Sequence, residues 1–164
     1  MKNINKVIEN EFVWLPLEKR KSKFGGPMTP RKAELRKPLL WLTRKNESLY
    51  LVNGSDEPFD SIIISSGGFT SNDGDGVTSY KGQGDEYENL HPNTGIKVDQ
   101  FDSLQGCDLI VQMHLRVKSL RLGCIDIRTI LGRKKIKETV LVWDTGEGGK
   151  DVFVKSLHQA QCAD

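Results

Sequence analysis

The chain lacks long hydrophobic runs: its longest apolar stretches are four to five residues, within a chain of 164. A helix needs about 20 predominantly apolar residues to cross a bilayer, so the sequence excludes a membrane-spanning helix. Residues 1–5 also lack the apolar stretch of a secretory signal peptide. We therefore expect a cytoplasmic protein without a membrane partner.

Cysteine is also scarce. The three cysteines, Cys107, Cys124 and Cys162, are an odd number and include no Cys-x-x-Cys pair. This argues against a disulfide framework and against a cysteine zinc site. We expect all three to be free thiols.

Catalytic motifs are missing as well. The chain has no His-Glu-x-x-His zinc motif, no Gly-x-Ser-x-Gly elbow and no complete phosphate-binding loop. Its three histidines, at 91, 114 and 158, do not have the spacing of metal ligands. The sequence therefore favours a binding module over an enzyme, and it predicts no catalytic residue, cofactor or metal ion.

Two weaker patterns leave other chemistry open. Asp144, Asp151 and Lys155 are similar to the carboxylates and lysine of a nuclease that uses Mg²⁺. Asp73 and Asp75 offer carboxylates to a divalent cation, although their loop lacks the full calcium-binding pattern. Carboxylates and lysines are common on solvated surfaces, so both patterns stay as alternatives.

Charge is unevenly distributed, although the net charge is only +2. Residues 1–50 carry 12 Lys or Arg against 5 Asp or Glu, residues 51–108 carry 2 against 11, and residues 109–164 carry 10 against 6. Basic flanks can hold phosphates, whose neutralisation supplies much of the affinity for nucleic acid. The same blocks are also compatible with ordinary solvated faces.

The composition, 37% hydrophobic and 28% charged, is typical of a globular domain. We expect one domain over 1–164, with 1–37 as a basic, irregular lead-in. Strand-like runs predict strands at 39–42, 49–52, 61–65, 76–80, 120–128, 135–143 and 151–157, and the run at 61–65 is apolar and β-branched. Apolar spacing predicts a helix over 99–117, and 66–98 are rich in loop residues. The pattern predicts a mainly β (α+β) domain with one or two helices, as a curved sheet or partly open barrel.

The most informative stretch is glycine-rich. A strand-like run at 61–65 leads into Gly67-Gly68-Phe69, Asp73-Gly74-Asp75-Gly76 and Tyr80-Lys81-Gly82-Gln83-Gly84. Glycine removes side-chain bulk and lets a backbone approach a ligand closely. An aromatic residue on each side of such a glycine-rich backbone is suited to stacking on the two faces of a flat ring. The pattern points to an extruded nucleobase.

This stretch, continued through Asn93-Thr94-Gly95 and Asp99-Gln100, resembles the SRA (SET and RING-associated, or YDG) domain. In bacterial members of that family a strand ends in Ser-Gly-Gly-Tyr. An acidic loop, Tyr-Thr-Gly-x-Gly, Asn-Thr-Gly and Asp-Gln then follow in order. The resemblance covers 61–109, whereas the family's upstream Gly-Val-His-Arg segment and later Tyr-Asp-Gly motif are absent.

The resemblance implies a fold and a function. SRA domains are β-rich and PUA-like, and they flip a modified cytosine out of duplex DNA between two aromatic side chains. The chain would then recognise 5-methyl- or 5-hydroxymethylcytosine in double-stranded DNA. It would be the specificity part of a restriction system, with a nuclease domain or subunit as its partner.

The resemblance also implies a base-binding pocket, made of Gly67, Gly68, Phe69, Asn72, Asp73, Tyr80 and Gly82. Phe69 and Tyr80 match the two stacking aromatics. The residue that reads the cytosine amine falls on Asn72 or on Asp73, depending on where a one-residue deletion lies. A carboxylate makes the stronger, charge-assisted hydrogen bond, so we favour Asp73.

Basic residues of the last third are the candidate contacts to DNA phosphates, namely Arg121, Arg128, Arg133, Lys134, Lys135 and Lys137. Their clustering favours a phosphate track, which positions a protein on DNA without reading bases. Three alternatives stay open: a compact modification-dependent nuclease, a PUA-like RNA- or nucleotide-binding protein, and a protein–protein inhibitor module.

Overall fold

The computed structural model describes residues 7–9, 12–16, 34–45, 48–72, 76–81, 85–98, 109–129, 132–133 and 136–158. At 7–9, 66, 68–72, 76–81, 109–111 and 133 it describes the backbone alone. The strands are β1 (Val7–Glu9), β2 (Pro38–Lys45), β3 (Ser48–Asn53), β4 (Phe59–Asn72), β5 (Gly76–Lys81), β6 (Asp85–Leu90), β7 (Thr94–Lys97), β8 (Leu109–Ser119), β9 (Gly123–Thr129), β10 (Gly132–Arg133), β11 (Thr139–Trp143) and β12 (Val152–Ser156).

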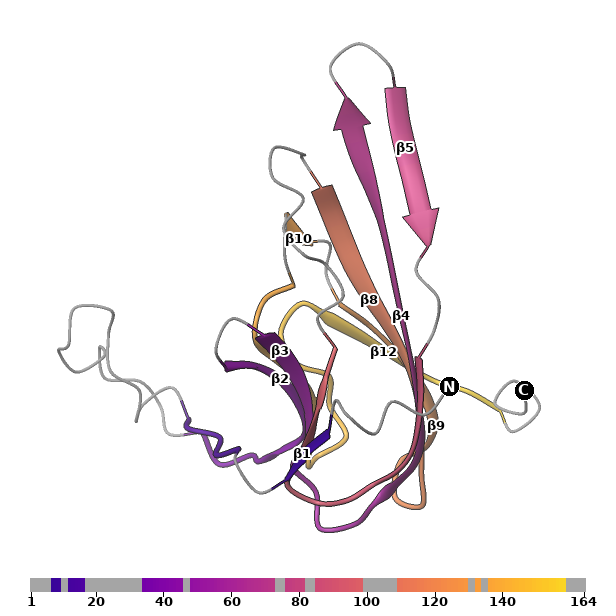
Figure 1. Cartoon of the computed structure of the whole chain (residues 1–164). Helices are drawn as coiled ribbons and strands as arrows, with labels where there is room; N and C mark the ends of the chain where they lie inside the picture. The colour runs from indigo at the N-terminus through magenta and orange to yellow at the C-terminus, as the bar shows by residue number, and fades with distance from the viewer. Residues whose placement is uncertain are drawn as a thin grey trace, which may run out of the picture.

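These strands form two antiparallel sheets (Figure 1). Sheet I has the order β1-β7-β3-β2-β11. Sheet II has the order β12-β9-β8-β4-β5, and in it β6 also pairs with β4 and β10 with β8. The predicted mainly β class is therefore confirmed, with no helix and no closed barrel among the described residues. None of the residues that the structure describes forms a helix able to cross a membrane.

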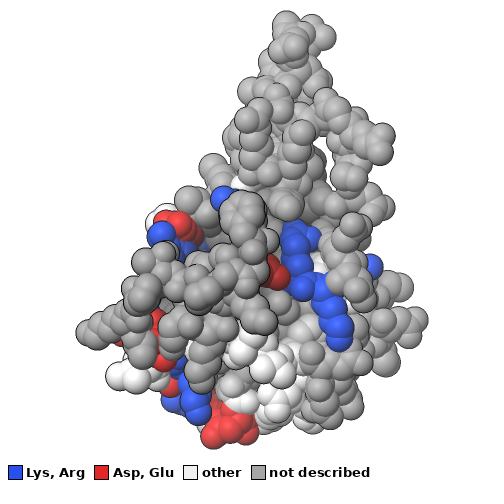
Figure 2. Space-filling view, turned by 90° about the vertical axis from the view of Figure 1, so that its left-hand side faces the viewer, with Lys and Arg blue, Asp and Glu red and all other residues white. Residues whose placement is uncertain are grey.

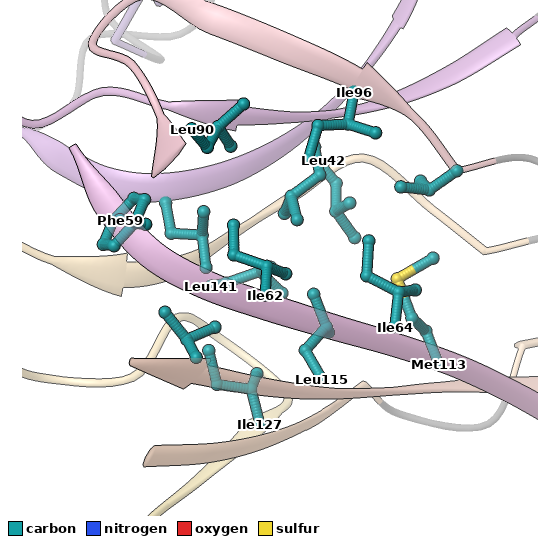
Figure 3. Close-up of a cluster of buried hydrophobic side chains, with 14 of the residues drawn as sticks. Leu42, Phe59, Ile62, Ile64, Leu90, Ile96, Met113, Leu115, Ile127 and Leu141 are labelled. Carbon is teal, nitrogen blue, oxygen red and sulfur yellow. The ribbon is translucent and has the colours of Figure 1, made fainter. Parts of the chain in front are cut away.

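The hydrophobic core lies between the two sheets (Figure 3). Successive residues of a strand face opposite sides, so one face of each sheet supplies the apolar side chains. Leu42 and Ile96 come from sheet I and Ile62, Leu115 and Ile127 from sheet II, and none is more than 1% exposed. The residues that alternate with these core residues lie on the outward face of each sheet.

The β4–β5 hairpin extends away from the two packed sheets (Figure 1). The first half of β4 pairs with β6, and its second half, from Gly67 to Asn72, pairs with β5. Along its other edge β4 pairs with β8, but only as far as Thr70. From Gly67 to Thr70 the hairpin is therefore continued by β8, and only Ser71 and Asn72 with the β5 residues opposite them form a two-stranded end. We call β5 and the paired part of β4 the ribbon.

The predicted helix over 99–117 is wrong for 109–117, which belong to β8, and 99–108 lie outside the described residues. Leu109, Met113 and Val117 are four residues apart. That spacing fits one face of a helix, but because it is even it also fits one face of a strand. Leu115, which the helical spacing omits, is fully buried, as an alternating strand requires.

The prediction that 66–98 are rich in loops is also wrong. This range contains the end of β4 and all of β5, β6 and β7. Glycine and acidic residues are depleted in strands on average, but here the ladder to neighbouring strands overrides that preference. Gly132 and Arg133, which lie between the strands predicted at 120–128 and 135–143, form β10 against β8.

The prediction of free thiols is wrong for Cys124, which is disulfide-bonded at the start of β9. Cys107 and Cys162 lie outside the described residues.

Gly149 packs so closely on β11 that a Cβ there would overlap the backbone carbonyl of Val140. We expect Gly149→Ala to lower the free energy of unfolding by about 3 kcal/mol, because backbone has to move. Gly146→Ala is the control, since Gly146 has a φ of 87° but no atom within 4 Å of an added Cβ. It should lower stability by only about 1 kcal/mol. Urea denaturation measures both, and equal losses would contradict the close packing of Gly149.

Candidate nucleic-acid interface

The β4–β5 hairpin carries the described members of the predicted pocket, which are Gly67, Gly68, Phe69, Asn72 and Tyr80. In its register Gly68 pairs with Tyr80, and Phe69 pairs with Ser79. The structure therefore brings these residues onto one ribbon, within a few residues of each other across the two strands.

Phe69 and Tyr80 occupy opposite faces of this ribbon in the observed register. Directly paired residues share a face, and successive residues alternate between faces. Tyr80 pairs with Gly68, so position 80 shares the face of Gly68, and position 69 lies on the other. Asn72, four residues after Gly68, shares the face of Tyr80. The register thus does not give the facing pair of aromatics that the resemblance implies.

Four of the predicted contact residues lie outside the described residues, namely Asp73, Gly82, Lys134 and Lys135. The predicted cation site at Asp73 and Asp75 lies outside them too. These predictions remain as the sequence made them.

The outward side of sheet II carries a row of basic side chains. We call the basic face the residues Arg116, Lys118, Arg128 and Lys155 of β8, β9 and β12. The pairs His114–Arg128, Arg116–Asp126 and Asp126–Lys155 place them on one face. Buried residues of β8 and β9 alternate with them on the core side. The result is a group of four basic side chains, spread over three neighbouring strands, on the outward side of sheet II.

Asp126 lies within the basic face and neutralises part of it. Its Oδ1 is 3.2 Å from Nε of Arg116 and 3.6 Å from Nε2 of His114. Lys118, Arg128 and Lys155 are exposed, and none has an ion-pair partner among the described residues. These three side chains can therefore meet an external anion.

The basic face is joined to the hairpin through the pairing of β4 with β8. Phe69 pairs with Ile110, and Ile110 pairs with Arg133 of β10. Positions 69 and 133 therefore share the outward face, two strand spacings or about 10 Å apart. The same face continues along β8 to Lys118. Predicted base-contact and phosphate-contact positions thus meet on one surface.

The other predicted phosphate contacts lie elsewhere. Arg121, at the far turn between β8 and β9, has its NH2 3.3 Å from the carbonyl of Asp144 and its NH1 4.0 Å from Asp56. Lys137 is exposed next to Ile136, whose carbonyl accepts a 2.8 Å hydrogen bond from Arg44 of sheet I. Of the predicted set, only Arg128 is a described side chain on the basic face.

Our sequence reasoning missed Arg116 as a member of this face, and it considered Lys155 only for the nuclease alternative. The signal is present in β8, where every second residue from Gln112 to Lys118 is polar. The helix assignment concealed that alternation.

The nuclease alternative gains no assembled metal site. Among the described residues, which include Asp144, Asp151 and Lys155, no group of three or more His, Cys, Asp or Glu side chains could hold a metal ion. The three residues are thus not brought into such a group.

A second feature lies on the outward side of sheet I, where the three tryptophans of the chain come together. Trp14 packs edge-on against Trp143, with ring centroids 5.6 Å apart and an interplanar angle of 83°. Trp14 and Trp41 together line two cavities, of about 300 and about 180 Å³. No sequence pattern pointed to this cluster, because its members are far apart in the chain.

Arg36 holds one side of this cluster in place. Its guanidinium carbon lies 4.3 Å from the ring centroid of Trp143. Its Nε and NH2 donate to the two carboxylate oxygens of Glu34, at 2.8 and 3.0 Å. These hydrogen bonds lower the pKa of Glu34 from 4.5 to about 2 and raise the pKa of Arg36. The hydrogen bonds therefore favour the charged form of both partners.

The side of the molecule on which sheet I lies has a mixed charge. In Figure 2, Lys and Arg side chains are interspersed with Asp and Glu side chains, and acidic ones gather at the end opposite the hairpin.

No protein-family model, no curated protein and no solved structure matches this chain. The functional interpretation therefore depends on the geometry above and on the sequence pattern.

Proposed function

We propose that this chain is an SRA-like module that binds duplex DNA and recognises a modified cytosine by base flipping. The β4–β5 hairpin reads the base, and the basic face contacts phosphates. One observation carries the proposal: the hairpin positions that resemble the SRA pocket are paired through β8 with a cationic surface. A nuclease domain or subunit is the partner that such a module serves.

The basic surface has the length of a DNA-binding site. From Lys118 to position 110, which pairs with Arg133, β8 rises about 3.4 Å per residue, or about 27 Å in all. Phosphates along one DNA strand are spaced at about 3.4 Å along the helix axis. A duplex whose axis ran parallel to β8 would therefore present about eight base-pair steps along this distance.

Base flipping costs a few kcal/mol, and stacking on an aromatic side chain offsets about 1–3 kcal/mol of this for each contact. We assign the stacking to Tyr80, because Asn72 shares its face and the opposite position is Gly68. Position 69 shares its face with the basic residues. Phe69 there contacts the duplex, where apolar side chains can fill the space between base steps.

Two neighbouring residues, Asn72 and Asp73, are the candidates for reading the cytosine amine. A flipped cytosine presents an N4 donor, and leaving it unpaired in a closed pocket costs about 1–3 kcal/mol. We expect Asp73→Ala to lose most of the preference for modified over unmodified duplexes, and Asn72→Ala to lose less. Competition binding with the two duplexes measures this preference. A collapse in Asn72→Ala alone would show that Asn72 is the reader, and unchanged selectivity in both would remove the loop from recognition.

Three measurements separate the proposal from its alternatives. Equilibrium binding should favour duplex DNA over RNA of the same sequence and over free nucleosides. Preference for RNA or nucleosides would favour the PUA-like alternative. Cleavage of modified DNA on addition of Mg²⁺ would favour a nuclease. An absence of any affinity for DNA would overturn the proposal and favour a protein-binding module.

A further inference from the structure

Phe153 is an exposed aromatic residue at the edge of sheet II. It belongs to β12, the first strand in the order β12-β9-β8-β4-β5, and it is 64% exposed. Phe153 pairs with Arg128, and Arg128 pairs with His114. Because directly paired residues share a face, Phe153 lies on the outward side of sheet II together with the basic face. No step of the proposed duplex recognition uses this residue.

Two cations flank the ring of Phe153. The Cβ atoms of directly paired residues are about 5 Å apart, so Arg128 lies beside Phe153 across the ladder. Lys155, two residues along β12, is on the same face at about 7 Å. Both side chains are exposed, and neither has an ion-pair partner among the described residues. Asp126, which pairs with Lys155 in the ladder, has its Oδ1 3.2 Å from Nε of Arg116 instead.

The ring itself is open. Within the part of the chain that the structure describes, no cation and no second aromatic ring lies over Phe153. An external ring can therefore stack on it, with a positive charge available on two sides.

The charges on the rest of this face direct an anion toward β12. Glu86 and Glu88 of β6 are exposed, and the β4 residues that they pair with also pair with Arg116 and Lys118 of β8. The two glutamates are therefore on the outward face, about two strand spacings or about 10 Å from these cations. The strands β9 and β12 lie further from β6 than β8 does. A phosphate is therefore repelled least beside Phe153.

An exposed ring between two cations fits a nucleotide better than a protein. The centre of a protein interface is depleted in charged residues, and burying Arg128 and Lys155 there without partners would be costly. A nucleotide brings a ring for Phe153 and phosphates for the two cations. Proteins that bind single strands combine these two kinds of contact. In a duplex the base faces are covered by their neighbours, and a base reaches a side chain only when it is flipped.

We propose that the edge of sheet II at Phe153 binds an unpaired strand of nucleic acid, with one base stacked on Phe153 and phosphates on Arg128 and Lys155. This activity goes beyond the duplex recognition proposed above. It uses part of the same basic face, but it requires neither the hairpin nor a modified base.

Fluorescence anisotropy of the full chain with a matched pair of strands tests this. One probe is oligo(dT) of about 12 nucleotides, within the usual range of single-strand site sizes. The other is an abasic strand of the same length, which has the same phosphates but no bases. We expect oligo(dT) to bind about tenfold more tightly, the effect of one base stacked on an aromatic ring. Oligo(U) in the same assay distinguishes RNA from DNA as the strand that is bound.

Phe153→Ser should weaken the binding of oligo(dT) about tenfold and leave the abasic strand unchanged. Phe153→Trp should keep the preference for oligo(dT), because it keeps a ring face. Replacing Arg128 and Lys155 together by glutamine should weaken both strands alike, since each then loses phosphate contacts. Val13→Ser is the matched control and should behave as the wild type does. Val13 is 80% exposed between Phe12 and Trp14, whose rings pack against sheet I.

Circular dichroism confirms that each variant is folded. The proposal is overturned if oligo(dT) does not bind saturably up to about 1 mM, if the two strands bind equally, or if Phe153→Ser keeps the preference of the wild type. The duplex proposal is judged separately, by the preference of the wild type for a modified duplex. Loss of that preference would leave the single-strand site standing, and Phe153→Ser should leave it unchanged.

Discussion

A variant with Lys118, Arg128 and Lys155 all replaced by glutamate is expected to bind every duplex about 100-fold more weakly near physiological salt. These exposed residues form the part of the basic face that has no ion-pair partner among the described residues. The slope of log K against log salt is about −0.9 for each phosphate contact, so losing three contacts should make it less steep by about 2.7. Modified and unmodified duplexes should be affected alike, because phosphate contacts carry no sequence information.

The matched control changes net charge by the same amount on the other sheet. Lys37, Lys97 and Lys150 are exposed residues on the side of sheet I, and their replacement by glutamate should have a much smaller effect on affinity and salt slope. Fluorescence anisotropy at several salt concentrations measures both quantities. Equal losses in the two triple variants would show that only overall charge matters, and an unchanged affinity in the first would make the basic face an ordinary solvated surface.

Tyr80→Ala is expected to weaken binding to a duplex with the recognised modification by about 5- to 150-fold, which corresponds to about 1–3 kcal/mol of lost base stacking. Non-specific binding to unmodified DNA should change little, because the phosphate contacts remain. Tyr80→Phe should retain most of the affinity, since it keeps the ring face. Competition between modified and unmodified duplexes gives both constants from one protein preparation.

The hairpin register makes Phe69→Ala an informative comparison with Tyr80→Ala. Positions 69 and 80 lie on opposite faces, so the two variants should differ. Phe69→Ala should weaken modified and unmodified duplexes to similar extents. If both variants lose the preference for the modified base equally, the two rings act on one base, and the separation assigned from the register is wrong.

The fold was predictable where sequence preference and tertiary pairing agree. The strand-like runs at 39–42, 49–52 and 61–65 all lie within strands. The prediction failed in β8, where apolar residues at a spacing of four fit a helix and a strand equally. It also failed in β6 and β7, because their pairing with neighbouring strands, rather than their composition, makes them strands. The strand predicted at 76–80 is present as β5.

The candidate interface was predictable only in part. The glycine-rich hairpin could be found because its chemistry is local in sequence. The basic face could not be found while β8 was read as a helix, since the alternation that defines it exists only in a strand. The tryptophan cluster depends on Trp14, Trp41 and Trp143, which only tertiary packing brings together.

The central claim is tested most directly by the affinity of the whole chain for four duplexes that differ at one cytosine. The duplexes carry cytosine, 5-methylcytosine, 5-hydroxymethylcytosine or glucosylated 5-hydroxymethylcytosine in the same sequence, and competition at fixed salt ranks them. A base-reading module should bind at least one modified duplex about tenfold or more tightly than the unmodified one, the effect of about 1.4 kcal/mol. Equal affinities for all four, or no affinity for duplex DNA, would contradict the account.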